Sequence, residues 1–482
     1  MVAYPGFISG SYTSQSPLAS QDRTVNWYPE RLENQSESIK IALYPTPGVV
    51  TRVSGTVGGG GRAHAFIAGR EFCIIGSTLY EVSSSWVMTN RGTVSTDLNP
   101  ATISTNGDGG GELFITSGAN GYVYTLATNV LAAIANLAGK ATMGDQLDGY
   151  FIALDAATST VYLSDLNDGT TWDPTQFIQR SIESDSWISM KTANRYIYLF
   201  GSKTSEVWFD AGSFPIPFEP HPSGLMQFGC SAPFSPKVVG NSIAWLGSTA
   251  NGVGLVLRTS GFVAEEVSTY AIHWAIENYS TLSDAIGDTY EAFGHKFYIL
   301  TFQTADATWV WDAQMNMWHE RGLWSASEDK FKAWRPLFHV FAFDQHRVLD
   351  FQSESVLQMS SDYFLDVGEA PLRRLRRAPA IVKENTLIFY SQFELDLEPG
   401  LGAVSGQGVA PLVMMRTSND GGKTWSSYRT ASAGALGVYG NRSIWNRCGA
   451  ARRRVFEVSV SDPIAWRILD AYLRVSPGSD QA

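Results

Sequence analysis

The chain has 482 residues, of which 44% are hydrophobic, 12% aromatic and 17% charged, and its formal net charge is −11. This length predicts one large domain or two to three smaller ones, with enough chain to bury a substantial core. The low charged fraction and the many aromatic residues exclude a disordered chain. The acidic balance argues against a protein whose whole surface binds nucleic acid. The 45 glycines predict many turns, as in an all-β protein.

The cysteines, the N-terminal residues and the apolar runs indicate where the protein is made and whether it enters a membrane. Cys73, Cys230 and Cys448 lie far apart and form no CxxC pair, so they predict neither a disulfide framework nor a zinc site. Residues 1–6 carry no basic stretch ahead of an apolar core, so we expect no signal peptide. The longest apolar run, at residues 130–138, is too short to span a bilayer. We therefore expect synthesis in the cytoplasm and no membrane insertion.

Short β-branched or alternating runs recur along the first three quarters of the chain, joined by turns of Gly, Asn, Asp and Ser. Such pairs of runs indicate β-hairpins. The leading runs begin near residues 65, 113, 150, 196, 243, 297 and 340. A repeat of about 40 to 50 residues with four short strands is typical of a β-propeller. We predict a propeller of six or seven blades over residues 61–369, preceded by an extended or β segment at 1–60; a pair of β-sandwiches is the alternative.

The character of the chain changes after residue 370. Runs at 386–394, 412–417, 455–460 and 468–475 read as strands, with Gly-rich loops between them. They predict a separate C-terminal antiparallel β-domain over residues 370–482, similar to a sandwich, with a small barrel as the alternative. This region holds 15 Lys and Arg against 9 Asp and Glu, whereas the first 369 residues hold 20 against 37. The asymmetry predicts two surfaces with different partners.

One short motif in the C-terminal region matches the Asp box of sialidases and other propellers, S-x-D-x-G-x-T-W. In such a turn the carboxylate accepts backbone N–H bonds, glycine supplies a positive φ, and tryptophan packs beneath the hairpin. The motif therefore predicts a stabilised turn and not a catalytic centre. Its residues are Ser418, Asp420, Gly422, Thr424 and Trp425.

Patterns that signal chemistry are missing from the sequence. The seven histidines show no HxH or HExxH spacing, and no GxSxG elbow occurs. The Gly runs at 58–61 and 107–111 lack the Lys-Ser/Thr that a phosphate-binding loop requires. Glu265 and Glu266 are adjacent on an expected strand and so point to opposite faces. We expect no catalytic residues, no cofactor and no metal site, and hence a protein that is not an enzyme.

Two arginine clusters are candidate interface residues. Arginine suits bidentate pairing with carboxylate or phosphate, and it suits buried interfaces. Three interpretations stay open: arginines that solvate strand ends, a protein–protein interface, or contact with the DNA backbone. The clusters consist of Arg373, Arg374, Arg376 and Arg377, and of Arg452, Arg453 and Arg454.

Several segments, taken together in order, resemble the packaged-DNA stabilisation proteins of short-tailed bacteriophages (podoviruses), also called tail hub or nozzle proteins or tail accessory factors. The resemblance covers nearly the whole chain. It is carried by RTVNWYPE (23–30), LYPTPG (43–48), FGSKTSEVWF (200–209), GCSAP (229–233), AWLG (244–247), YILTF (298–302), WVWD (309–312), WHER (318–321), WNRCG (445–449) and FEVSVSDP (456–463).

The resemblance implies a structural protein of the virion tail. In this family a ring of subunits, usually six, extends the portal and its adaptor ring, helps to retain packaged DNA, and receives the needle or plug and the tailspikes. Double-stranded DNA would pass the ring without its sequence being read. An acidic lining would suit that passage, because a basic one would hold DNA through counterion release.

A second function class stays open from the sequence. The Asp box and the aromatic content also fit a glycan-binding or glycan-cleaving β-propeller of a phage tail. That alternative predicts binding or cleavage of a surface polysaccharide by the isolated protein. The tail hub instead predicts stoichiometric presence in virions and no turnover of a substrate.

Overall fold

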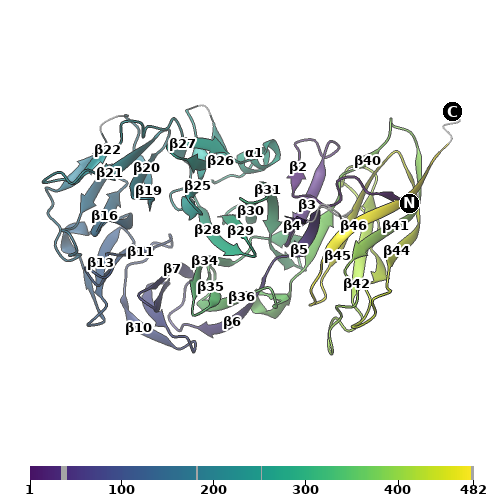
Figure 1. Cartoon of the computed structure of the whole chain (residues 1–482), viewed down its shortest axis with the longest axis horizontal. Coiled ribbons are helices and arrows are strands. Elements are labelled where there is room, and N and C mark those ends of the chain that lie inside the picture. Colours follow the sequence, from purple (N-terminus) through teal and green to yellow (C-terminus); the bar gives the residue numbers. More distant parts are fainter. Residues whose placement is uncertain (34–40, 181–182, 251, 479–482) are drawn as a thin grey trace.

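The computed structural model describes residues 1–33, 41–180, 183–250 and 252–478; the last residues of the predicted C-terminal domain, 479–482, lie outside that part. The described chain is almost entirely β, with one α-helix, α1 (Tyr270–Glu277). It forms a ring of antiparallel sheets with a β-sandwich at one side (Figure 1). The all-β prediction, a propeller followed by an antiparallel domain, is confirmed.

Seven sheets of the described chain surround a common axis, so the propeller has seven blades. Blades 1 to 6 are each formed by strands that are consecutive in sequence, and we number the blades in chain order. They are β7 (Gly61–Ile67) to β10 (Met88–Thr93), β11 (Thr102–Thr105) to β14 (Val130–Ala133), β15 (Met143–Leu147) to β18 (Phe177–Gln179), β19 (Trp187–Ala193) to β22 (Phe218–Pro220), β23 (Gly229–Cys230) to β27 (Val263–Glu266), and β28 (Ala285–Ala292) to β31 (Met317–Arg321).

Blade 7 closes the ring with strands from two distant parts of the chain. Its first three strands are β34 (Pro336–Ala342), β35 (Gln345–Asp350) and β36 (Ser355–Ser360). The fourth is β6 (Gly48–Ser54), which pairs antiparallel with β36. The predicted domain boundary at residue 60 is therefore wrong. About 300 residues separate β6 from its partner β36 in the sequence. A local sequence pattern cannot reveal such a pairing.

In five of the blades the predicted leading strand is not the first strand. The runs near residues 113, 150, 196, 243 and 297 are second strands, and an inner strand precedes each. The second strands are buried almost throughout, which makes them apolar runs, whereas the inner strands carry polar side chains that face the axis. The second strands are β12 (Glu112–Ser117), β16 (Tyr150–Asp155), β20 (Tyr196–Gly201), β25 (Ser242–Ser248) and β29 (His295–Phe302).

The C-terminal domain is a sandwich of two sheets around an aromatic core. Phe393 stacks on Phe456 at 4.8 Å between ring centroids and on Trp445 at 5.5 Å. N-terminal strands complete one of the sheets. That sheet contains β1 (Val2–Ala3), β4 (Trp27–Arg31), β5 (Ile41–Pro45), β41 (Ile388–Leu397), β44 (Ser443–Ala451) and β46 (Ile468–Pro477); the other contains β39 (Arg374–Arg377), β42 (Leu412–Ser418), β43 (Arg429–Ser432) and β45 (Arg453–Val460).

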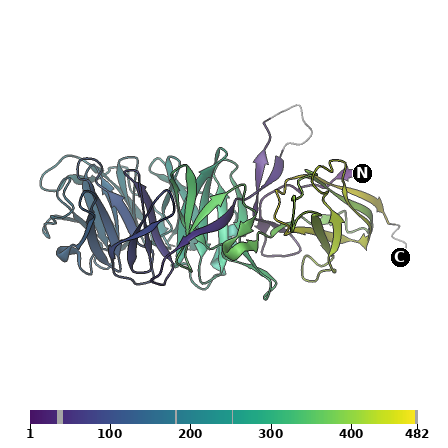
Figure 2. The same cartoon turned by 90° about the horizontal axis from the view of Figure 1, so that it is seen from below.

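The two domains share one continuous sheet. Strand β3 (Gln21–Val25) pairs antiparallel with β39 of the sandwich and, at Val25, in parallel with β31 of blade 6. It lies between the propeller and the sandwich in Figure 1, and Figure 2 shows the same side-by-side arrangement from below. The sandwich is thus attached by backbone hydrogen bonds and not by a linker alone.

A buried charged network ties blade 7 to blade 1. The Arg347 guanidinium lies 2.5 Å from a Glu71 carboxylate oxygen and 3.7 Å above the Trp86 ring. The second Glu71 oxygen lies 2.9 Å from Nε2 of His64. The side chains of this ion pair and of His64 have no exposed surface. The network therefore fastens the ring where its first and last blades meet.

Replacing Arg347 with methionine should leave the buried Glu71 carboxylate without its arginine partner. We expect the free energy of unfolding to fall by about 3–5 kcal/mol, measured by urea denaturation. Arg258→Met, which breaks a solvent-exposed pair with Glu265, is the matched control and should cause a much smaller change. Equal losses in the two variants would contradict the assigned role of the network.

Candidate functional site

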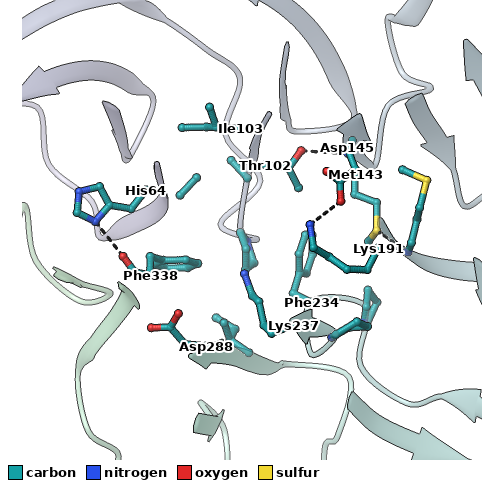
Figure 3. Close-up of a pocket in the computed structure, with 18 of the residues that line it drawn as sticks. His64, Thr102, Ile103, Met143, Asp145, Lys191, Phe234, Lys237, Asp288 and Phe338 are labelled. Carbon is teal, nitrogen blue, oxygen red and sulfur yellow. Dashed lines mark hydrogen bonds and ion pairs between the residues drawn. The ribbon is translucent and has the colours of Figure 1, made fainter. Parts of the chain in front are cut away.

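The inner strands of all seven blades line a central cavity of about 150 Å³. Its polar side chains come from different blades and point toward the axis (Figure 3). Lys191 Nζ lies 2.5 Å from an Asp145 carboxylate oxygen, which also accepts a hydrogen bond from the backbone N–H of Thr192 at 3.0 Å. The charges of Lys191 and Asp145 therefore neutralise each other within the central cavity.

A second pair of charged residues lines the opposite part of the cavity. Asp288 accepts a hydrogen bond from the backbone N–H of His339 at 2.9 Å. Burial raises the pKa of Asp288, and the nearby charge of Lys237 opposes that rise. Burial likewise lowers the pKa of Lys237, and the nearby charge of Asp288 opposes this decrease. Burial, with His346 next to it, lowers the pKa of His339 to about 3, so this imidazole is neutral at pH 7.

The size of the cavity limits what can enter it. Small-molecule sites usually occupy about 300–1,000 Å³, and the channel offers about 150 Å³. A double helix cannot pass through it. Any DNA passage formed by this protein must therefore lie outside the ring of blades.

Three of the four arginines of the first cluster lie on β39, the sandwich strand that pairs with β3 at the domain junction. The side chain of Arg376 is fully buried and its guanidinium donates to the backbone carbonyls of Gly6 and Phe7 at 2.9 and 2.5 Å. It also pairs with Asp22 at 2.7 Å. Arg374 is fully buried as well. The interpretation of these two arginines as interface residues is wrong, because both are buried within the chain and Arg376 holds the N-terminal segment.

The other two arginines of this cluster alternate with aromatic rings. The Arg373 guanidinium lies 3.7 Å from the centre of Trp324, and that of Arg377 lies 4.7 Å from Trp425. Arg416 stands 4.7 Å from both Trp425 and Tyr428. Trp324 belongs to β32 (Leu323–Ser325), which follows blade 6, so the stack runs from the propeller to the Asp-box turn. Cation–π contacts thus reinforce the shared sheet.

One arginine of the second cluster is also buried. Arg454 is 4% exposed and donates to the carbonyls of Cys448 and Ala450 and to the side chain of Asn419. Its interpretation as an interface residue is likewise wrong. Arg452 is exposed and Arg453 is half-buried. These two, with the half-buried Arg373 and Arg377, are the members of both clusters that reach the surface.

The Asp box forms the predicted turn. Asp420 accepts hydrogen bonds from the backbone N–H groups of Lys423 and Thr424, both at 2.9 Å, and from the Thr424 hydroxyl at 2.5 Å. The indole N–H of Trp425 donates to the Gly422 carbonyl at 3.0 Å. The Asp420 carboxylate is therefore used inside the turn, as expected for a residue with a structural role.

The turn also faces the N-terminal segment and not a cleft. Gly421 has a φ of 75°, and a Cβ there would lie 2.9 Å from the Leu18 side chain and 3.0 Å from the Pro17 carbonyl oxygen. Another residue at this position would be strained and crowded. The Asp box thus helps to hold the N-terminal segment against the sandwich.

A related turn occurs in blade 3, where the sequence pattern missed it. Asp168 accepts hydrogen bonds from the hydroxyls of Thr170 and Thr171, and the Trp172 indole donates to the Gly169 carbonyl at 2.8 Å. The order Asp-Gly-x-Thr-Trp was the available signal. It is one residue shorter than the Asp box, so the longer pattern did not match it.

Across the described ranges, no three His, Cys, Asp or Glu side chains gather in a way that could hold a metal ion. No helix in the described part of the chain is long and apolar enough to cross a membrane.

Comparison with protein families decides the assignment. The family model described as Bacteriophage P22 Gp10, beta-propeller, matches residues 7–363, and its counterpart described as beta-sandwich matches residues 373–476. The chain belongs to this family. These are structural proteins of the phage tail, the tail-hub or packaged-DNA stabilisation family, and the resemblance inferred from the sequence is confirmed. The protein is accordingly a component of a virion tail.

Other comparisons add only distant likeness. No curated protein matches the chain. Among solved structures, virginiamycin B lyase from Staphylococcus aureus is 10% identical with a TM-score of 0.41, over 69% of this chain and 98% of that one. The N-terminal domain of Nup159 is 9% identical with a TM-score of 0.38, over 65% and 98%. PorZ of Porphyromonas gingivalis is 10% identical with a TM-score of 0.38, over 80% and 46%.

Replacing Arg376 with methionine should release the N-terminal segment. The variant leaves Asp22 and two backbone carbonyls without their buried donor, so we expect a loss of about 3–5 kcal/mol in the free energy of unfolding. Limited proteolysis should then cut within residues 1–20 at protease levels that leave the parent intact. Arg474→Met, at an exposed position, is the control. Unchanged cleavage in the Arg376 variant would contradict this role.

The Asp420 turn should stabilise the fold in a pH-dependent way. Hydrogen bonds from Thr424 and Ser418 lower the pKa of Asp420 below its ordinary value of 3.8. Because the folded pKa is the lower one, this stabilisation is present above pH 3.8 and is lost as pH falls below it. The difference in Tm between the parent and Asp420→Asn should therefore be larger at pH 6 than at pH 3. A difference that stays constant with pH would contradict the assignment.

Proposed function

We propose that this protein is the subunit of a tail hub, a ring that extends the channel of the portal and its adaptor. The observation that carries the proposal is the family match across both domains, residues 7–363 and 373–476. The shared sheet through β3 supports it, because a subunit that extends a channel has to keep its two domains in fixed relative positions.

In this proposal the ring contains six copies and helps to retain packaged DNA. DNA passes along the axis of the six-subunit ring, through the space that the subunits surround. It does not pass through a propeller, since the cavity of about 150 Å³ inside the ring of blades admits no duplex. The excess of acidic residues in the first 369, 37 against 20 basic ones, favours passage without adhesion or sequence reading. The ring would receive the needle or plug and the tailspikes, after synthesis in the cytoplasm of the bacterial host.

The proposal includes no catalytic step by this chain. The glycan-binding or glycan-cleaving alternative rested on the Asp box and the aromatic content. The Asp420 carboxylate is engaged within its own turn, and the Trp425 ring lies 4.7 Å from the guanidinium groups of both Arg377 and Arg416. Neither side chain therefore favours the alternative over a structural role.

Imaging the protein with the portal–adaptor complex of the same genome tests the hub directly. By negative-stain electron microscopy we expect a symmetric extension on the adaptor that is missing without this protein. Class averages should show six copies. Free monomers at saturating concentration, with a bare adaptor, would contradict the proposal.

The same experiment can test the arginines that reach the surface. A variant with Arg452→Ser and Arg453→Ser removes both arginines of the second cluster that reach the surface. Arg474→Ser is the matched control. If the cluster contacts the adaptor or a neighbouring copy, the double variant should stay folded but form few extensions. Normal extensions from the double variant would exclude that contact and leave the hub itself unaffected.

A further inference from the structure

The central cavity contains a lysine that has no hydrogen-bond or ion-pair partner in the described part of the chain. Lys237 opens β24 (Lys237–Val239), the inner strand of blade 5. Figure 3 shows its side chain reaching into the middle of the cavity, with no hydrogen bond or ion pair to the other residues drawn. Its ammonium makes none with any residue in the described part of the chain.

The neighbouring charged and polar groups are already engaged. Lys191 pairs with Asp145 at 2.5 Å. The two ring nitrogens of His64 contact the Phe338 carbonyl and the Glu71 carboxylate, at 2.8 and 2.9 Å. An ammonium that leaves bulk water without a counter-charge is strongly disfavoured. The lining therefore supplies a cation whose charge the protein itself does not neutralise by contact.

Asp288, on the neighbouring blade 6, does not fill this role. It is 5% exposed and takes its hydrogen bond from the backbone of His339. Its charge acts on Lys237 at a distance, without forming an ion pair. Both side chains line the cavity of about 150 Å³.

We propose that the central channel of the propeller binds a small oxyanion, of the size of phosphate or acetate, with the Lys237 ammonium as its main donor. A lysine ammonium offers three hydrogen-bond donors, which suits a carboxylate or phosphate oxygen. The cavity is too small for a nucleotide or an oligosaccharide but has room for such an ion. This binding site does not depend on the tail-hub function, and either can be wrong without the other.

Thermal unfolding of the full chain in added salts tests the site. At pH 7 and constant ionic strength, sodium phosphate or sodium acetate replaces sodium chloride in steps. A ligand that binds the folded protein raises Tm in a saturable way. We expect this saturable rise in the parent and in Lys203→Met, whose lysine is exposed, and its loss in Lys237→Met. The two salts distinguish a phosphate from a carboxylate ligand.

A second variant should change the affinity in the opposite direction. Asp288→Asn removes the negative charge nearest the site and keeps an oxygen that can accept from His339. We expect half-saturation at a lower anion concentration than in the parent. Disruption of the fold would move both variants the same way, so opposite shifts identify binding. Equal salt responses in the parent and in Lys237→Met would overturn the proposal.

Discussion

The whole architecture depends on the strand pairing at β3. This strand forms part of neither a blade nor the sandwich core, yet it pairs with β39 on one side and with β31 on the other. The next residue, Asn26, has a φ of 59° and is fully buried, and its amide bonds the carbonyls of Gly322 and Arg373 at 2.8 and 2.7 Å. The propeller and the sandwich therefore form one hydrogen-bonded body.

Buried arginines follow from this junction. The N-terminal segment at residues 6–10 is irregular, so its carbonyls lack strand partners and need donors from elsewhere. Arg376 supplies several from one planar group, to Gly6, Phe7 and the Ser9 hydroxyl. Lysine could not match it, because its three donors leave from a single nitrogen. A run of arginines that suggests an external partner in the sequence is thus explained by partners inside the chain.

The sequence predicted the features that depend on local patterns and missed those that depend on distant pairing. The repeat of 40 to 50 residues predicted a propeller of six or seven blades, and the Asp-box residues predicted their own turn. The polar inner strands, such as β15 with Asp145, were missed because an axis-facing strand lacks the apolar run that marks its neighbour. The closing strand β6 and the Lys237 cavity arise only when seven blades meet, so no single segment contains their signal.

The excess of basic residues in the C-terminal part of the chain does not produce a correspondingly basic surface. The excess of basic residues after residue 370 suggests a basic surface when counted along the sequence. Arg374, Arg376 and Arg454 are buried, however, and Arg377 and Arg416 share the buried carboxylate of Glu457. Charges that are buried or paired contribute little to the field that steers a partner. Much of the basic excess therefore acts within the molecule, fastening the sandwich and the N-terminal segment, and not as a surface that attracts DNA.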